Sequence, residues 1–256
     1  MLTRSKQIKY FVINTTSALT YLNRFRKSEK AEDLHKFRVK IKKLKSMFQF
    51  ITPHWKNDKV FHEFKQLNKF FRKSGAIRDL DVGIVLLKGF KGVNSALLLK
   101  LDQNRKQHVL KFISKIDKSK VDISKNKKKS SIHFNPIKDV FIEKTFAKKL
   151  KPIFTILLKD FSKPKKIHKA RKQIKQLLYF SELVPKSVAL KLNINTKDLN
   201  KIQGKIGEWH DTFNVKSLLT TLRYDAPDLL NRINKDELRL EKQLKILTKR
   251  LIIKIK

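Results

Sequence analysis

Two stretches of this chain carry histidine, arginine and lysine at helical spacing beside an apolar stripe. In residues 34–48 the apolar side chains recur every three or four positions, and a second set recurs one step further around the helix. This second set consists of His35, Arg38, Lys42 and Lys45. Its members border the face that the helix buries. Arginine supplies a planar fork of donors and lysine a mobile charge, so the row suits the oxygens of phosphate groups.

The same pattern returns in residues 167–179. There the matching positions are His168, Arg171 and Lys175. A second pair of segments, 67–82 and 199–214, aligns in the same order and at nearly the same offset. In this pair Lys69 matches Lys201, Lys73 matches Lys205, Gly75 matches Gly207, Asp79 matches Asp211, and Arg78 meets His210. Two matching blocks in the same order indicate an internal duplication.

These motifs carry a family resemblance. A helix of the form H-x-x-R-x-x-I-K-x-L, followed by a G-x-x-R-D-x-D helix start, resembles the CHAD domain, the conserved histidine α-helical domain. The resemblance covers nearly the whole chain and implies an all-α fold of two four-helix bundles related by a pseudo-twofold axis. It also implies a basic central cavity that binds inorganic polyphosphate. Leu178 stands where a basic residue is usual, and Phe213 stands opposite Asp81, so we expect fewer ligand contacts from the second half.

Composition independently favours a polyanionic partner. The chain has 256 residues and a net charge of +40, from 62 Lys and Arg against 22 Asp and Glu. Such an excess favours nucleic acid, an anionic membrane or polyphosphate as a partner. A nucleotide-composition bias would also enrich surface lysine, but it does not explain arginines and histidines placed in register. The lack of cysteine excludes a disulfide framework and a thiolate metal site.

The elements that position these residues are expected to be helices. Apolar periodicity and breaker residues predict helices over 4–26, 28–51, 57–74, 77–87, 93–116, 136–160, 164–184, 196–206, 209–222 and 225–253. Residues 118–134 are rich in lysine, lack periodicity and are expected to form a linker. The linker would join a first repeat, 1–117, to a second repeat, 135–256, within one domain.

The candidate polyphosphate-binding residues lie on the two motif helices and on the segments that follow them. They are His35, Arg38, Lys42, Lys45, Lys69, Arg72, Arg78, His168, Arg171, Lys175, Lys201, Lys205 and His210. The first row climbs about 15 Å at roughly 1.5 Å per residue, enough for several phosphates. Arg78 and His210 are expected at the starts of short helices, where free backbone N–H groups also favour anions. Asp79 and Asp211 are expected to cap a helix or orient a base.

The motifs of common enzyme classes are missing from the sequence. It contains no E-x-E-x-K segment, no H-E-x-x-H zinc motif and no glycine-rich P-loop. We therefore expect a protein that is not an enzyme, with no cofactor and no metal. The alternative is a nucleic-acid-binding or nucleoid-associated helical protein, and a metal-dependent phosphohydrolase is a third option.

The sequence also bounds where the protein is found. No apolar run reaches the roughly 18 to 20 residues that span a bilayer, so no transmembrane segment is expected. We expect a cytoplasmic protein, with association with polyphosphate granules left open. The sequence does not determine the oligomeric state.

Overall fold

The chain folds into helices throughout the part that the structure describes. The computed structural model describes residues 1–51, 58–90, 93–119, 134–159, 164–192, 196–221 and 227–255. Its helices are α1 (Arg4–Ser28), α2 (Ala31–Ile51), α3 (Asp58–Lys73), α4 (Gly75–Lys88), α5 (Ser95–Asp117), α6 (Asp139–Lys159), α7 (Pro164–Ser181), α8 (Lys186–Lys191), α9 (Thr196–Thr221) and α10 (Pro227–Ile255). Within these ranges no strand forms, and Leu2 and Ile137 make an isolated bridge. The predicted all-α fold is confirmed.

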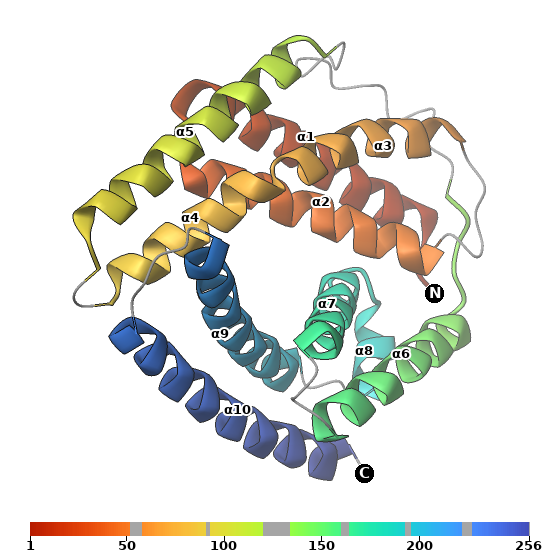
Figure 1. Ribbon diagram of the computed structural model, residues 1–256. Coiled ribbons are helices and arrows are strands. Elements are labelled where there is room, and N and C mark those ends of the chain that lie inside the picture. The colour runs from red at the N-terminus through yellow and green to blue at the C-terminus, as the bar shows by residue number, and fades with distance from the viewer. Residues whose placement is uncertain are drawn as a thin grey trace.

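The helices are arranged as a ring around α2, α4, α7 and α9 (Figure 1). The two motif helices, α2 and α7, pack against each other, and α4 packs against α9. The first part of the chain therefore contacts the second along two lines. Among the helices described, none is both long and apolar enough to cross a membrane.

The apolar core is shared between the two parts of the chain. Phe50 of α2 stacks on Phe180 of α7 with ring centroids 3.9 Å apart. A second cluster joins two helices from each part and consists of Leu80, Leu87, Leu97, Leu101, Val215, Leu219, Leu229 and Ile233. Residues 1–117 and 135–256 thus bury their apolar faces against each other as well as internally. The pseudo-twofold relation between them stays a prediction.

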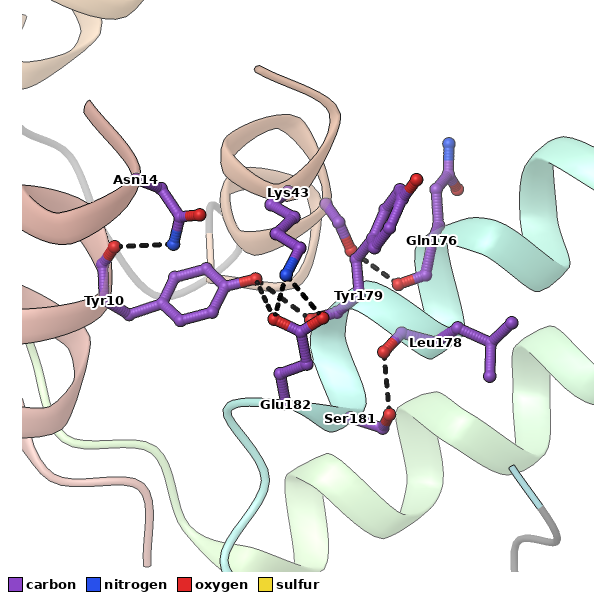
Figure 2. A network of polar contacts seen from close by, with 9 residues as sticks. Tyr10, Asn14, Lys43, Gln176, Leu178, Tyr179, Ser181 and Glu182 are labelled. Atoms are coloured by element: carbon purple, nitrogen blue, oxygen red, sulfur yellow. Dashed lines mark hydrogen bonds and ion pairs between the residues drawn. The ribbon is translucent and has the colours of Figure 1, made fainter. Parts of the chain in front are cut away.

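A polar network holds α7 against α1 and α2 (Figure 2). The Tyr10 hydroxyl donates to the backbone carbonyl of Tyr179 at 3.1 Å, and Lys43 Nζ lies 2.7 Å from Glu182. The fully buried Ser46 donates to a backbone carbonyl of α7 at 2.5 Å. Burial raises the pKa of Tyr10, so its hydroxyl remains a donor. These contacts fix the position of the second motif helix relative to the first.

The structure bears on three sequence predictions about the helices and the linker. The break at Gly75 is confirmed, because α3 ends at Lys73 and α4 begins at Gly75. The separate helices predicted over 196–206 and 209–222 are wrong, since α9 is continuous from Thr196 to Thr221, and the short α8 was not predicted. The lysine-rich linker lies outside the described residues except for positions 118, 119 and 134.

Candidate anion-binding site

The two motif helices bring their cationic rows to the border of the core. On α2 the buried positions are Leu34, Phe37, Ile41, Leu44 and Phe48. On α7 they are Ile167, Ala170, Ile174 and Leu177. His35, Arg38, Lys42 and Lys45 of α2 are half-buried beside the first set, and His168, Arg171 and Lys175 of α7 are half-buried beside the second. Because α2 packs on α7, the rows are held close to each other.

Five of the predicted residues form one electrostatic group, here called the central cationic cluster. It consists of Arg38 and Lys42 from α2, Arg78 from α4, and Arg171 and Lys175 from α7. Burial, together with repulsion from the other four members, lowers the pKa of Lys42 to about 7. Burial, with repulsion from Arg171 and Arg78, lowers the pKa of Lys175 to about 8.

Two carboxylates lie near this cluster. Asp79 interacts most strongly with Arg38, and Asp211 with Arg171. Burial raises the pKa of both aspartates, while the neighbouring cations oppose that change. Two carboxylates cannot neutralise five cationic side chains, so the site keeps an excess of partly desolvated positive charge. This excess favours an anionic ligand.

Arg38 is committed to contacts within the first part of the chain. Its Nη1 donates to the Phe71 carbonyl at 2.6 Å and to Ser74 Oγ at 2.8 Å. Its guanidinium also lies over the Phe71 ring, 4.3 Å from the centroid, and Lys45 Nζ lies 5.3 Å from the same ring. The carbonyl is available because the break at Ser74 separates α3 from α4 and leaves C-terminal carbonyls of α3 without intrahelical donors.

Arg171 occupies a different environment, against the backbone of α9. An ideal Cβ on Gly207 would lie 2.4 Å from Arg171 Nη2. The Nε of Arg171 is buried without a hydrogen-bond partner among the described residues. Ile206 takes the sequence position that Ser74 holds in the first part, so no hydroxyl is available there.

Two histidines of the second part lie face to face beside Arg171. The rings of His168 and His210 stack with centroids 4.2 Å apart, and His168 Nδ1 is buried without a partner in the described part of the chain. Burial, together with repulsion from His168 and Arg171, lowers the pKa of His210 to about 4. Burial also lowers the pKa of His35 and of His168.

The expected helix-start position holds for one of two residues. Arg78 lies in the first turn of α4, and its backbone N–H donates to the Ser74 carbonyl at 3.2 Å. His210 lies in the interior of α9, so the prediction of a helix start there is wrong. The reason is that α9 continues through Gly207, where the first part of the chain breaks.

The other predicted ligand residues lie outside the central cationic cluster. Lys69 and Arg72 of α3 and Lys201 of α9 are exposed. Arg72 contributes to the repulsion that acts on Lys45. Lys205 pairs with Glu208 at 2.6 Å. Contacts between these residues and a ligand stay predictions.

The sequence did not reveal the partner of Asp81. Its Oδ1 lies 2.6 Å from Arg105 Nε, and Arg105 Nη2 donates to the Glu29 carbonyl at 2.8 Å. Asp81 is 3% exposed, so this is a buried ion pair that ties α4 to α5 and to the α1–α2 corner. Phe213, at the matching position, is 40% exposed. The departure at Phe213 therefore concerns a structural contact.

Comparison with known proteins agrees with this architecture. The CHAD domain family model matches residues 15–220. A similar solved structure is the crystal structure of the CHAD domain from the plant Ricinus communis, with a TM-score of 0.60 and 14% identity over 94% of this chain and 91% of that chain. At that identity the similarity concerns the fold. No curated protein matches. Because the family model spans most of the chain and includes both motif helices, the chain belongs to the CHAD domain family.

Proposed function

We propose that this protein binds inorganic polyphosphate, or another linear polyanion, and does not hydrolyse it. The observation that carries the proposal is the central cationic cluster, in which five cationic side chains from three helices are opposed by two carboxylates. A chain of phosphates supplies closely spaced charges and acceptor oxygens that would offset this repulsion. Membership of the CHAD family supports the same ligand, because polyphosphate binding is the general property of that family.

The half-buried placement of the cluster favours a narrow ligand. Its side chains border apolar cores on α2 and α7, where a single phosphate chain can approach more easily than a duplex. The net charge of +40 and the many exposed lysines favour a second candidate, nucleic acid bound to the outer surface. Polyphosphate binding would depend on the central cationic cluster, whereas nucleic-acid binding would depend on the exposed lysines.

A competition experiment distinguishes them. Long-chain polyphosphate and duplex DNA, at matched charge concentration, would compete for the protein while KCl is raised in steps. We expect polyphosphate to bind more tightly, and six to ten neutralised charges would cost roughly 10³ to 10⁵ in affinity between about 50 and 200 mM salt. A phosphate-release assay with Mg²⁺ or Mn²⁺ should stay at background.

A matched pair of charge reversals locates the ligand. Lys42→Glu alters the central cationic cluster, and Lys111→Glu alters an exposed position on α5. We expect Lys42→Glu to weaken polyphosphate binding by about 100-fold, since it removes one attractive charge and adds a repulsive one in a partly desolvated site. Lys111→Glu should change affinity by less than about threefold, because salt screens an exposed charge. Equal losses would favour binding by net charge alone.

A further inference from the structure

Gly207 provides room that no other residue type would leave for Arg171. It is buried in the interior of α9, and an ideal Cβ there would lie 2.4 Å from Nη2, 3.0 Å from Cζ and 3.3 Å from Nε of Arg171. Three atoms along one edge of the guanidinium therefore lie next to the place where a side chain at position 207 would begin. Glycine in a helix interior costs about 1 kcal/mol relative to alanine, so the helix itself gains nothing from it.

The other glycines at comparable places do not have this contact. Gly204, one turn earlier in α9, has nothing within 4 Å of an ideal Cβ, and neither has Gly75, which matches Gly207 in sequence. Gly83 in α4 also has a close neighbour, Leu218 Cδ2 at 2.9 Å, but that neighbour is apolar, so among the described glycines it is Gly207 that a cationic side chain approaches.

Two nitrogens around this contact are without a hydrogen-bond partner among the described residues. Arg171 Nε and His168 Nδ1 are each buried and without a hydrogen-bond partner in the described part of the chain. A buried N–H without a partner is costly. An acceptor oxygen of a ligand would remove that cost at Arg171 Nε, and at His168 Nδ1 in the tautomer that carries its proton there. Arg38 differs, because its Nη1 already donates to the Phe71 carbonyl and to Ser74.

We propose that Gly207 is a positioning residue that seats the guanidinium of Arg171, and that Arg171, rather than Arg38, makes the principal arginine contact with phosphate. Arg38 then acts mainly to hold the α3–α4 break. This inference rests on the proposed function and adds that two arginines that match in sequence contribute unequally to phosphate binding.

Two glycine substitutions in α9 test whether Gly207 positions the guanidinium of Arg171. Gly207→Ala should displace the guanidinium and weaken polyphosphate binding by about tenfold or more in calorimetry. Gly204→Ala should leave affinity unchanged. Neither should lower the unfolding temperature, since alanine favours the helix and the atoms that the Gly207→Ala methyl meets belong to the end of a flexible side chain.

A double-mutant cycle separates positioning from general damage. In an Arg171→Ala background, Gly207→Ala should have no further effect on affinity, because the group that it displaces is gone. Arg171→Ala should weaken binding more than Arg38→Ala, while Arg38→Ala should lower the unfolding temperature more.

The outcomes distinguish the inference from the function on which it rests. If wild-type protein binds polyphosphate and Gly207→Ala binds as tightly as Gly204→Ala, the inference is wrong and the function stands. The same holds if folded Arg38→Ala loses more affinity than Arg171→Ala. Failure of the wild-type protein to bind polyphosphate would overturn both.

Discussion

The two motif helices agree at their lysines and differ at their arginines. Lys42 of α2 and Lys175 of α7 match in sequence, and both are repelled by Arg171 and Arg78. Burial, with this repulsion, lowers their pKa values to about 7 and about 8. Arg38 and Arg171 also match, yet one is hydrogen-bonded at a helix break and the other lies on a glycine of an unbroken helix. The two parts of the chain are thus alike where α2 packs on α7. They differ where α2 contacts the α3–α4 break and where α7 contacts α9.

The difference follows from a few substitutions behind the motif helices. Ser74 and Phe71 give Arg38 a hydroxyl, a backbone carbonyl at the end of α3 and an aromatic face. The matching residues in α9 are Ile206 and Gln203, which provide none of these. Arginines at positions that match in sequence therefore need not make the same contacts, because the helix packed against each one sets its partners.

The largest expected effect concerns the ion pair that the first half has and the second lacks. Asp81→Asn leaves Arg105 with a buried, uncompensated charge, and we expect it to lower the free energy of unfolding by about 3 kcal/mol. Phe213→Ala, at the matching exposed position, should change it by less than about 0.5 kcal/mol. Urea denaturation of both variants measures the contrast, and similar losses would show that the two positions are structurally equivalent.

A smaller effect on stability is expected at Lys42, where the two motif helices carry matching lysines. The unfolded-state pKa of a lysine is about 10.4, whereas that of Lys42 in the folded protein is about 7, so between these values the unfolded state binds more protons and stability rises with pH. Lys42→Met should therefore stabilise the ligand-free protein by about 1 kcal/mol at pH 6, and the gain should shrink toward pH 10. Thermal denaturation across this range measures it.

Deprotonation of Lys42 should weaken polyphosphate binding, although it favours the folded state. Phosphate stabilises the protonated lysine, so polyphosphate affinity should fall as pH rises above about 7, where binding must take up a proton. Lys175→Met should show a smaller stability gain than Lys42→Met, because its folded pKa lies closer to the unfolded value. A Lys42→Met variant that is less stable than wild type at pH 6 would contradict this account of the cluster.

The smallest expected effect comes from making the first half resemble the second. Phe71→Gln removes the ring that faces Arg38 and Lys45 and copies the residue found at position 203. Cation–aromatic contacts at half-exposed sites contribute about 0.5 to 1 kcal/mol, so we expect a fall of about 2 °C in the unfolding temperature. Gln203→Phe should give no matching gain, because Leu178 replaces the second cation there. A gain equal to the loss would contradict this asymmetry.

The helices were largely predictable from the sequence, and the exceptions have physical causes. Apolar residues at helical period placed α1, α2, α5 and α10 close to their observed bounds. The interruption predicted in α9 was wrong because Gly207 lowers helix propensity without ending the helix, and packing against α7 and α10 favours continuity. The six-residue α8 is too short to show a period.

The placement of two rows of cations at the border of the core was predictable, but the partners of those side chains were not. Border positions on a helix follow from period alone, which is why Lys42 and Lys175 were identified. The contacts of Arg38 with Ser74, of Arg171 with Gly207 and of Asp81 with Arg105 depend on how separate helices cross. A single sequence contains no record of those crossings.

The sharing of core residues between the two parts of the chain bears on how the protein folds. The contact between Ser46 and α7 joins residues 130 positions apart, and the cluster that contains Leu80 and Val215 is equally non-local. Closing such long loops is slow compared with forming the α1–α2 hairpin. We therefore expect the cations of α2 and α7 to meet late in folding, against their own repulsion. A partly folded chain would then present separate basic helices, and the combined cluster would form only when α7 packs on α2.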